Sequence, residues 1–541
     1  MKASDLFVKI LENKWVETIY WVPWEENLDL LESLSHSSID FITVHNEQTA
    51  VFMAATYGRF TGKPWVALAT LWPGSTNMMT GVAYAQLGGM PVIVITWQKP
   101  QNKSKQGAFQ IIDVVGMMTP ITKYATSIVS WNRIPYILEN AFRIAEEEKP
   151  GAVHIELPED IAAEEVETEY SITDLATRKI RRPVIDSKSL QTLISELESA
   201  RSPIILIWAW ANRKRITKYL TRFIEKYNIP HFTSQMGKWV VDGSLESYLG
   251  TAALTSWDYI HDAISQSDLI ISVGYDNAEK PTDILWIHGI KVINVNFVTS
   301  NFDYVYSPYL DIIWDIGNVF WQLCESEIDS SAWDFAKILE INKLNHQKIQ
   351  DNLALEDDIS FMQPRRLAKE LREVLADDDI LALDNGLYKV WLARNYMARK
   401  PNTILLDNAL ASMGAWYATA MEAKRLNPQH KVVCVTGDGG VLMNLWDIST
   451  AVRLNLDIVI IILNNDSYGM IKWKQKNENF TDYGLDFSNP NFKMMAESFW
   501  ATWYTIEKKE DFKPTLETAI AGKWVHIIDL TFDYPSDGKI I

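Results

Sequence analysis

Apolar and polar positions form a repeating pattern along the chain, in which short β-branched runs are followed by stretches whose apolar residues recur at helical spacing. Such runs predict buried parallel strands, and the stretches between them predict helices that cross from one strand to the next. The pattern therefore indicates an α/β protein with parallel sheets. The clearest predicted strands cover residues 41–44, 66–70, 91–96, 152–157, 202–207, 231–235, 269–273 and 310–315.

Two polar segments divide this pattern into three groups. Residues 161–190 carry little periodicity and are typical of a connector, and residues 333–358 are charged and helical in pattern. A chain of 541 residues also exceeds the size at which a single core keeps growing. We therefore predict three doubly wound parallel-sheet domains, which cover residues 1–165, 190–335 and 360–541.

The third predicted domain contains the stretch with the most specific chemistry, VVCVTGDGGVLMNLWDISTAVRLNLDIVIIILNNDSYG, at residues 432–469. Residues 431–436 and 457–463 are predicted to form neighbouring parallel strands, and residues 441–454 to form the helix that connects them. Because parallel strands point the same way, the loops that follow them emerge at one edge of the sheet.

The first of these loops is rich in glycine, which lets the chain turn tightly and brings backbone N–H groups up to an anion such as a phosphate. Its glycines are Gly437, Gly439 and Gly440. Asp438 in this loop and Asn465 in the second loop offer oxygen ligands for Mg²⁺, and a backbone carbonyl near Ser467 supplies a third. An ordinary glycine turn between strand and helix needs neither the acid nor the paired amides. We therefore predict a site for a metal ion and a diphosphate.

The spacing of these residues resembles the motif of enzymes that depend on thiamine diphosphate. Gly437-Asp438-Gly439 is followed, after 24 residues, by Asn464-Asn465. Residues 45–50, with the sequence HNEQTA, and Tyr57-Gly58-Arg59 are similar to the pyrimidine-binding segment of the same family. The resemblance spans nearly the whole chain. It implies that the three domains are, in order, pyrimidine-binding, central and diphosphate-binding.

Glu47 matches the catalytic glutamate of that family. A buried carboxyl that hydrogen-bonds the aminopyrimidine ring favours the imino tautomer, whose nitrogen removes the weakly acidic C2 proton of the thiazolium. Considered without the family, Glu47 is an acid at a helix N-terminus, where the helix dipole favours it. Because Glu47 and Asp438 lie in different domains, the resemblance implies a cofactor bound across a subunit interface, and hence a homodimer or homotetramer.

Several segments are most similar to acetolactate synthases of the flavin-independent, catabolic kind. By resemblance, the substrate is a small 2-oxoacid, and the reaction condenses two pyruvates to 2-acetolactate with release of CO2. FAD in the central domain is allowed by the resemblance but is not expected. Phe109 is expected to pack on the reacting group and Gln110 to hydrogen-bond substrate oxygens; a core aromatic and a surface amide are the alternatives. The similar segments are residues 25–27, 73–77, 103–107, 109–110 and 468–475.

Further residues match positions beside the cofactor in this family. Met413 matches a bulky residue that wedges under the cofactor and bends it, so that the exocyclic nitrogen reaches C2. A methionine that merely fills the core is the alternative. The other expected cofactor contacts are Pro73, Asn385, Gly414, Tyr468, Gly469, Met470 and Gln475.

Composition narrows the choice of function. The formal charge of −18 disfavours nucleic acid or an anionic membrane as a partner, and no apolar run approaches the roughly 20 residues of a membrane span. Only two cysteines occur, so we expect no disulfide framework and a cytoplasmic protein. Two alternatives remain: another thiamine-dependent 2-oxoacid decarboxylase, carboligase or oxidase, and a non-catalytic homologue that keeps the fold.

Tryptophan is frequent, with 22 residues, and many stand where relatives usually carry glycine. Such positions often need a positive φ or a close backbone approach, which glycine allows and an indole does not. We predict that one codon rendered here as tryptophan is decoded as glycine in the source cell, whereas Trp391 and Trp473 are genuine. The positions concerned are Trp21, Trp24, Trp65, Trp72, Trp97, Trp208, Trp210, Trp239, Trp416, Trp446, Trp500, Trp503 and Trp524.

Overall fold

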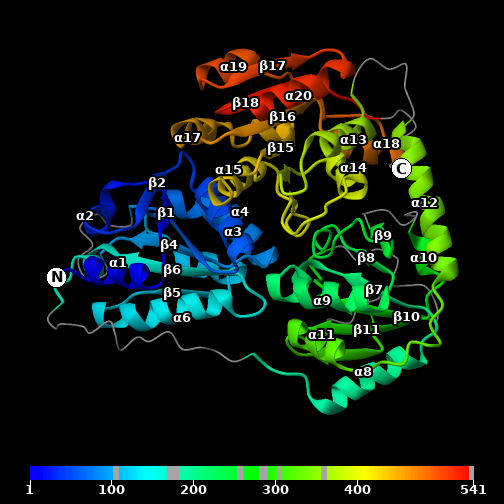
Figure 1. Ribbon diagram of the computed structural model, residues 1–541. Coiled ribbons are helices and arrows are strands. Elements are labelled where there is room, and N and C mark those ends of the chain that lie inside the picture. The colour runs from blue at the N-terminus through cyan, green and yellow to red at the C-terminus, as the bar shows by residue number, and fades with distance from the viewer. Residues whose placement is uncertain are drawn as a thin grey trace. The chain divides into compact units, whose positions relative to one another are not determined.

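The computed structural model describes residues 1–100, 109–166, 182–252, 260–279, 290–300, 307–354 and 362–534. These residues form three six-stranded sheets flanked by helices, and the neighbouring strands within each sheet run parallel (Figure 1). The predicted α/β fold with three parallel-sheet domains is therefore confirmed. None of the described helices combines the length and the apolar character needed to cross a membrane.

The first sheet has the strand order β2-β1-β3-β4-β6-β5. Its inner strands are buried apolar runs, as expected for parallel strands that are covered on both faces. Its strands are β1 (Thr18–Trp21), β2 (Asp40–Thr43), β3 (Trp65–Leu68), β4 (Val92–Gln98), β5 (Tyr124–Ser127) and β6 (Ala152–Pro158). The accompanying helices are α1 (Ala3–Asn13), α2 (Leu28–Ser35), α3 (Glu47–Thr61), α4 (Trp72–Leu87), α5 (Val114–Met118), α6 (Ile134–Glu146) and α7 (Glu159–Ala162).

The second sheet has the order β12-β11-β10-β7-β8-β9. Its strands are β7 (Pro203–Ile207), β8 (His231–Thr233), β9 (Tyr248–Thr251), β10 (Leu269–Val273), β11 (Lys291–Asn296) and β12 (Leu310–Ile313). The accompanying helices are α8 (Ser187–Ser199), α9 (Lys214–Tyr227), α10 (His261–Ile264), α11 (Ile316–Glu325) and α12 (Ala336–Ala354). Helix α8 therefore begins inside the segment that was expected to be a connector.

The third sheet has the order β14-β13-β15-β16-β18-β17. The chain moves one way from β13 to β14 and the other way to β15, and α/β sheets bind ligands outside the carboxyl ends of strands at such a reversal. Its strands are β13 (Ile380–Leu383), β14 (Ile404–Leu405), β15 (Val432–Gly437), β16 (Ile458–Asn464), β17 (Thr502–Ile506) and β18 (Val525–Thr531). The helices are α13 (Pro364–Val374), α14 (Leu387–Asn395), α15 (Trp416–Leu426), α16 (Asp438–Val441), α17 (Ile448–Arg453), α18 (Gly469–Asn477), α19 (Phe492–Ser498) and α20 (Phe512–Ala521).

The prediction of one continuous helix over residues 441–454 is wrong. Helix α16 already ends at Val441, and the stretch itself holds a short 3-10 turn over Leu445–Asp447 and the helix α17. Between α16 and the 3-10 turn, Asn444 leaves the helical conformation, with φ −141°, and its side chain donates to the carbonyl of Gly414 at 2.9 Å.

The chain divides into two compact units. One unit is formed by Met1–Ile180, Gly414–Pro428 and Met443–Leu456, and the other by Arg181–Met413, Gln429–Leu442 and Asp457–Ile541.

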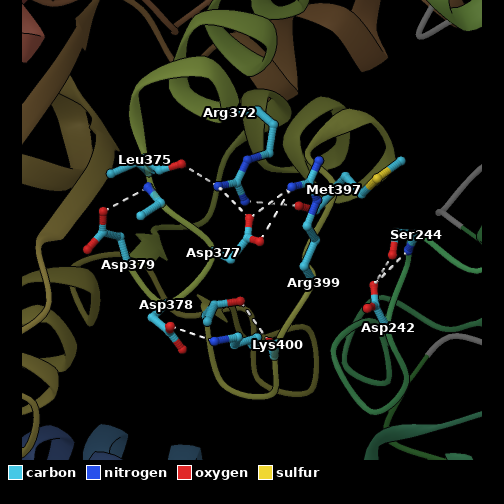
Figure 2. Close-up of polar contacts among 12 residues, drawn as sticks. Asp242, Ser244, Arg372, Leu375, Asp377, Asp378, Asp379, Met397, Arg399 and Lys400 are labelled. Atoms are coloured by element: carbon cyan, nitrogen blue, oxygen red, sulfur yellow. Dashed lines mark hydrogen bonds and ion pairs between the residues drawn. The ribbon is translucent and has the colours of Figure 1, made fainter.

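A charged cluster lies at the amino ends of strands β13 and β14 (Figure 2). Asp377 pairs with Arg399 at 3.1 Å, and Asp378 pairs with Lys400 at 2.5 Å. Asp379 accepts the backbone N–H of Lys431 at 2.8 Å, which joins the start of β13 to the start of β15. Exposed ion pairs of this kind contribute only ~0–1 kcal/mol, so we assign the cluster a local structural role.

Glu279, a buried acid that follows β10 of the second sheet, predicts how the stability of the protein depends on pH. Glu279 accepts from the Ser234 hydroxyl at 2.7 Å and from the Met236 N–H at 3.0 Å, and burial raises its pKa to about 7. Because the folded state then holds this proton more tightly than the unfolded state, the free energy of unfolding falls as the pH rises from the ordinary glutamate range to about 7. Glu279→Gln should flatten that fall in denaturant titrations. The exposed Glu225→Gln is the control, and an equal slope in both variants would contradict the assignment.

Candidate functional site

The two loops predicted to hold a metal ion do lie together. Asp438 follows β15 and is 2% exposed, and its Oδ2 accepts the backbone N–H of Asn465 at 3.1 Å and of Asp466 at 2.7 Å. Asn489, from a third loop, donates its side-chain amide to the same oxygen at 2.9 Å. Because β15 and β16 are paired in parallel, their carboxyl ends bring these loops to one edge of the sheet.

This arrangement fits a cation. The described contacts of the Asp438 carboxylate are all with neutral N–H groups, so its buried charge is not neutralised by them. The buried Asn489 Oδ1 and Ser467 Oγ find no hydrogen-bond partner among the described residues. Nearby, burial raises the pKa of Asp529, with the Asp438 and Asp466 carboxylates adding to the effect. Carboxylate and amide oxygens of this kind are suitable ligands for Mg²⁺.

The glycines of the first loop differ in how much space surrounds each of them. A Cβ at Gly440 would lie 2.2 Å from Asp384 Oδ2 and 2.6 Å from Thr436 Oγ1, so a larger residue there would have to displace these side chains. A Cβ on Gly437 would make only an ordinary contact, 3.6 Å from the Tyr388 ring. The Gly437 N–H donates to the Tyr388 hydroxyl at 3.1 Å, which holds the turn from one side. Gly439 faces the ring of Tyr468.

Substitutions of Gly440 and Gly437 are therefore expected to have opposite effects. Gly440→Ala should destabilise the protein by ~1–3 kcal/mol and weaken cofactor binding, because the side chains of Asp384 and Thr436 must move. Gly437→Ala should be tolerated, since its backbone is extended, with φ −77° and ψ 160°. Denaturant titration and cofactor titration of both variants test the contrast. Equal loss in both variants would show that the space around the two residues does not govern the loop.

Glu47 begins helix α3 at the carboxyl edge of the first sheet and is 7% exposed. The preceding Asn46 caps the helix by accepting the Gln48 N–H at 2.8 Å. The Glu47 Oε2 accepts from the side-chain amide of Asn77 at 3.0 Å, and a Cβ on Gly74 would approach its Oε1 to 2.9 Å. The carboxyl is thus buried, and one neutral donor orients it.

The remaining predicted residues lie on the following elements, and their roles stay predictions. Pro73 is in the first turn of α4. Phe109 and Gln110 directly follow the undescribed residues 101–108. Phe109 is exposed, and Gln110 has a φ of 54°. Tyr468 precedes α18, whose first two residues are Gly469 and Met470. Gln475, on the same helix, is half-buried and hydrogen-bonds the backbone of Tyr483 at 3.4 Å.

Asn385 follows β13, and its amide is engaged within the protein. Its Nδ2 donates to the carbonyl of Ser412 at 2.6 Å, and its Oδ1 accepts from Lys389 at 2.6 Å. This places Asn385 beside the peptide that leads to Met413. Gly414, the next residue, has a φ of +87°, which favours glycine.

Asn489 and Tyr388 at the metal site were missed from the sequence, and Asn77 beside Glu47 was named there only as part of the segment 73–77. Asn489 reaches Asp438 across 51 positions, and Tyr388 reaches Gly437 across 49. Asn77 contacts Glu47 from a different helix. No local motif marks the contacts of Asn489 and Tyr388, although the position of Tyr388 shortly after β13 ends at Leu383 was a usable signal.

Family models of the thiamine pyrophosphate enzymes match the chain in three places. The N-terminal TPP binding domain matches residues 1–117, the central domain residues 190–323, and the C-terminal TPP binding domain residues 384–530. These matches follow the three parallel sheets in order and include both Glu47 and Asp438. The chain belongs to the thiamine pyrophosphate enzyme family, which confirms the resemblance seen in the sequence.

Relatives of this chain are named acetolactate synthases. The acetolactate synthase of Bacillus subtilis (strain 168) is 28% identical over 540 residues, which cover 98% of this chain and 93% of the relative. The catabolic acetolactate synthase of Raoultella terrigena is 28% identical over 538 residues, with 98% and 95% covered. The probable acetolactate synthase large subunit of Methanococcus aeolicus is 28% identical over 555 residues, with 98% and 92% covered.

Proposed function

We propose that this protein is an acetolactate synthase that condenses two pyruvates to 2-acetolactate and releases CO2, with thiamine diphosphate and Mg²⁺ bound. The observation that carries the proposal is the buried, oriented Asp438 carboxylate beside Asn465, at the strand ends where the family binds the cofactor diphosphate. The names of the relatives, which are acetolactate synthases, support acetolactate as the product. FAD is not part of the proposal.

The residues of this chain would divide the chemistry between them. When bound, thiamine diphosphate supplies a thiazolium that accepts the electron pair left by decarboxylation. Asp438, Asn465 and a carbonyl near Ser467 would hold the metal ion and, through it, the diphosphate. Glu47 would hold a proton at the pyrimidine ring nitrogen, and Phe109 and Gln110 would contact the substrate. The cofactor would lie across the interface of a homodimer or homotetramer in the cytoplasm.

An assay with pyruvate tests this proposal. Protein made with glycine at the suspect tryptophans named above is incubated with thiamine diphosphate, Mg²⁺ and pyruvate, and acetolactate is measured directly. The expected result is acetolactate that depends on both additions. Release of acetaldehyde instead would favour a decarboxylase, and turnover of benzoylformate or an oxalyl thioester in preference to pyruvate would favour another member of the family. Cofactor binding with no turnover of any of them would indicate a non-catalytic homologue.

A further inference from the structure

We propose that Lys389 is a positioning residue that fixes the 407–413 segment against the diphosphate-binding loop; this inference rests on the proposed function. Lys389 lies in the first turn of α14 and is 3% exposed. Its ammonium group donates to Asn385 Oδ1 at 2.6 Å, to the carbonyl of Asp407 at 2.9 Å and to Asn408 Oδ1 at 3.2 Å. One cation therefore joins the loop after β13 to the loop after β14.

The segment held by Lys389 is further constrained from within. The Asp407 carboxylate accepts the backbone N–H of Ala409 at 3.1 Å and of Ala411 at 2.7 Å, and Ala411 has a left-handed φ of 55°. Asn385, which accepts from Lys389, donates to the carbonyl of Ser412. The path from the lysine thus ends at the peptide bond directly before Met413, the residue expected to contact the cofactor.

The same turn of α14 also holds the diphosphate-binding loop. Tyr388, next to Lys389, accepts the Gly437 N–H at 3.1 Å, and Asp384 accepts from the Thr436 hydroxyl at 3.1 Å. Adjacent side chains of one helix therefore set the 407–413 segment and the Gly437 turn relative to each other. Such a link would align the part of the cofactor near Met413 with its diphosphate.

Burial of an ammonium group is costly, and hydrophobic residues often replace buried charges without loss of stability. Desolvation lowers the pKa of Lys389 to about 8, while Asp407, Asp384 and Glu279 favour its charged form. A charged, triply hydrogen-bonded lysine is therefore better explained by the geometry it imposes than by the stability it adds.

Lys389→Met tests this role through two separate measurements on the protein with bound Mg²⁺. The Kd for thiamine diphosphate should change little, because Asp438 and Asn465 remain. Exchange of the cofactor C2 proton with D2O, measured by NMR after acid quench, should slow by roughly 100-fold, because misplacement of the order of 1 Å has effects of that size. Lys389→Arg should recover part of the exchange rate.

Two further variants keep the test decisive. Asn385→Ala removes the link to Ser412 and should slow the C2 exchange as Lys389→Met does, even if Lys389→Met does not fold. Lys226→Met is the control away from the site, since Lys226, an exposed lysine, also donates to two carbonyls, those of Cys324 and Ser326. Unchanged C2 exchange in the Lys389 and Asn385 variants would overturn the positioning role alone. Failure of the wild type to bind thiamine diphosphate would overturn the proposed function instead.

A second inference rests on backbone conformation. Trp15, Trp500 and Trp524 have left-handed φ values of 63°, 59° and 79°, and they are 76%, 79% and 51% exposed. A left-handed conformation costs a residue with a Cβ ~1–2 kcal/mol, and a bulky residue adopts it rarely. Because these three side chains are exposed, little packing offsets the conformational cost of their left-handed backbone.

Trp15 and Trp500 occupy the same helix-ending motif. After α1, the N–H of Trp15 donates to Glu12 and that of Val16 to Leu11, at 2.9 and 3.1 Å. After α19, Trp500 and Ala501 repeat this pattern, with two bonds of 3.0 Å. The left-handed position of this motif is usually glycine, sometimes asparagine.

Elsewhere in the chain the same motif carries the usual residues. Gly89, with φ 64°, donates to Gln86 while Met90 donates to Ala85. Asn455, with φ 53°, donates to Val452 while Leu456 donates to Ala451. The tryptophans at 15 and 500 are therefore exceptions to a pattern that this chain otherwise follows.

Buried tryptophans point the same way. The indole N–H groups of Trp21, Trp65 and Trp97 are buried and find no acceptor among the described residues. Each such orphaned donor costs ~1–3 kcal/mol. We infer that the cell that makes this protein inserts glycine at Trp15, Trp500 and Trp524, and at the other suspect tryptophans named from the sequence. Trp15 was not among the positions predicted from the sequence.

Peptide mass spectrometry of the protein isolated from its source cell tests this inference. The peptides that span positions 15 and 500 should have masses that match glycine, and masses that match tryptophan would overturn it. In recombinant protein, Trp15→Gly and Trp500→Gly should each raise Tm by roughly 2–4 °C. Trp15→Ala should give a smaller gain, and Trp391→Gly, in a buried helical position, should lower Tm. Equal effects of glycine and alanine at position 15 would contradict the conformational argument.

Discussion

Replacing Glu47 by glutamine is expected to lower kcat by roughly 10²–10⁴-fold, the usual contribution of a general acid or base. Glutamine keeps the size of the side chain and its acceptor for the Asn77 amide, but it has no carboxyl proton to place on the cofactor ring. Because the diphosphate is held elsewhere in the chain, the Kd for thiamine diphosphate should stay close to that of the wild type. Steady-state kinetics and calorimetric titration of the same preparation measure the two quantities.

Asn77→Ala is the matched companion to this variant. It removes the donor to Glu47 Oε2 and leaves the carboxyl in place, so it should reduce kcat less than Glu47→Gln does. A Glu47→Gln enzyme with wild-type kcat would remove Glu47 from the chemistry. It would then be a helix N-terminal acid without a catalytic part.

Asp438→Asn should lower the apparent affinity for thiamine diphosphate in the presence of Mg²⁺ by more than about 100-fold, beyond the 10–100-fold typical of residues that only support a ligand. The substitution removes the charge that balances the metal ion, and it presents an amide to the N–H groups of Asn465 and Asp466. Calorimetric titration with and without Mg²⁺ measures the loss.

Two variants bracket this prediction. Asn489→Ala should cost less than Asp438→Asn, because Asn489 orients the carboxylate and Asp438 carries the charge. Asp377→Asn, in the exposed cluster at the amino ends of β13 and β14, should leave cofactor affinity unchanged (Figure 2). Affinity that is equally insensitive to Asp438→Asn would refute the metal site.

The strands around the metal site were predictable, and the connection between them was not. Runs 431–436 and 457–463 were placed within a residue or two of β15 and β16, because strands buried on both faces are nearly continuous apolar sequences. The helix between them breaks because Asn444 bonds to Gly414, 30 positions earlier, and helical periodicity does not report such a contact.

The residues of the candidate site likewise divide into those that a sequence motif marks and those that only the folded structure reveals. Glu47, Asp438 and Asn465 were predicted because a motif fixes their spacing and the chemistry explains why each residue type is needed, and their roles stay predictions. Asn489, Tyr388 and Lys389 act through contacts made only after the chain has folded, so their own sequence neighbourhoods give little sign of them. The left-handed backbone at Trp15 likewise became apparent only from the hydrogen bonds that end α1.

A crystal structure of the protein with thiamine diphosphate and Mn²⁺, in which the ion is located by its anomalous scattering, would test the metal site directly. We expect one ion bound by the Asp438 carboxylate, the Asn465 side-chain oxygen and a backbone carbonyl near Ser467, with diphosphate oxygens completing its coordination. An ion or a diphosphate bound away from these loops would refute the site.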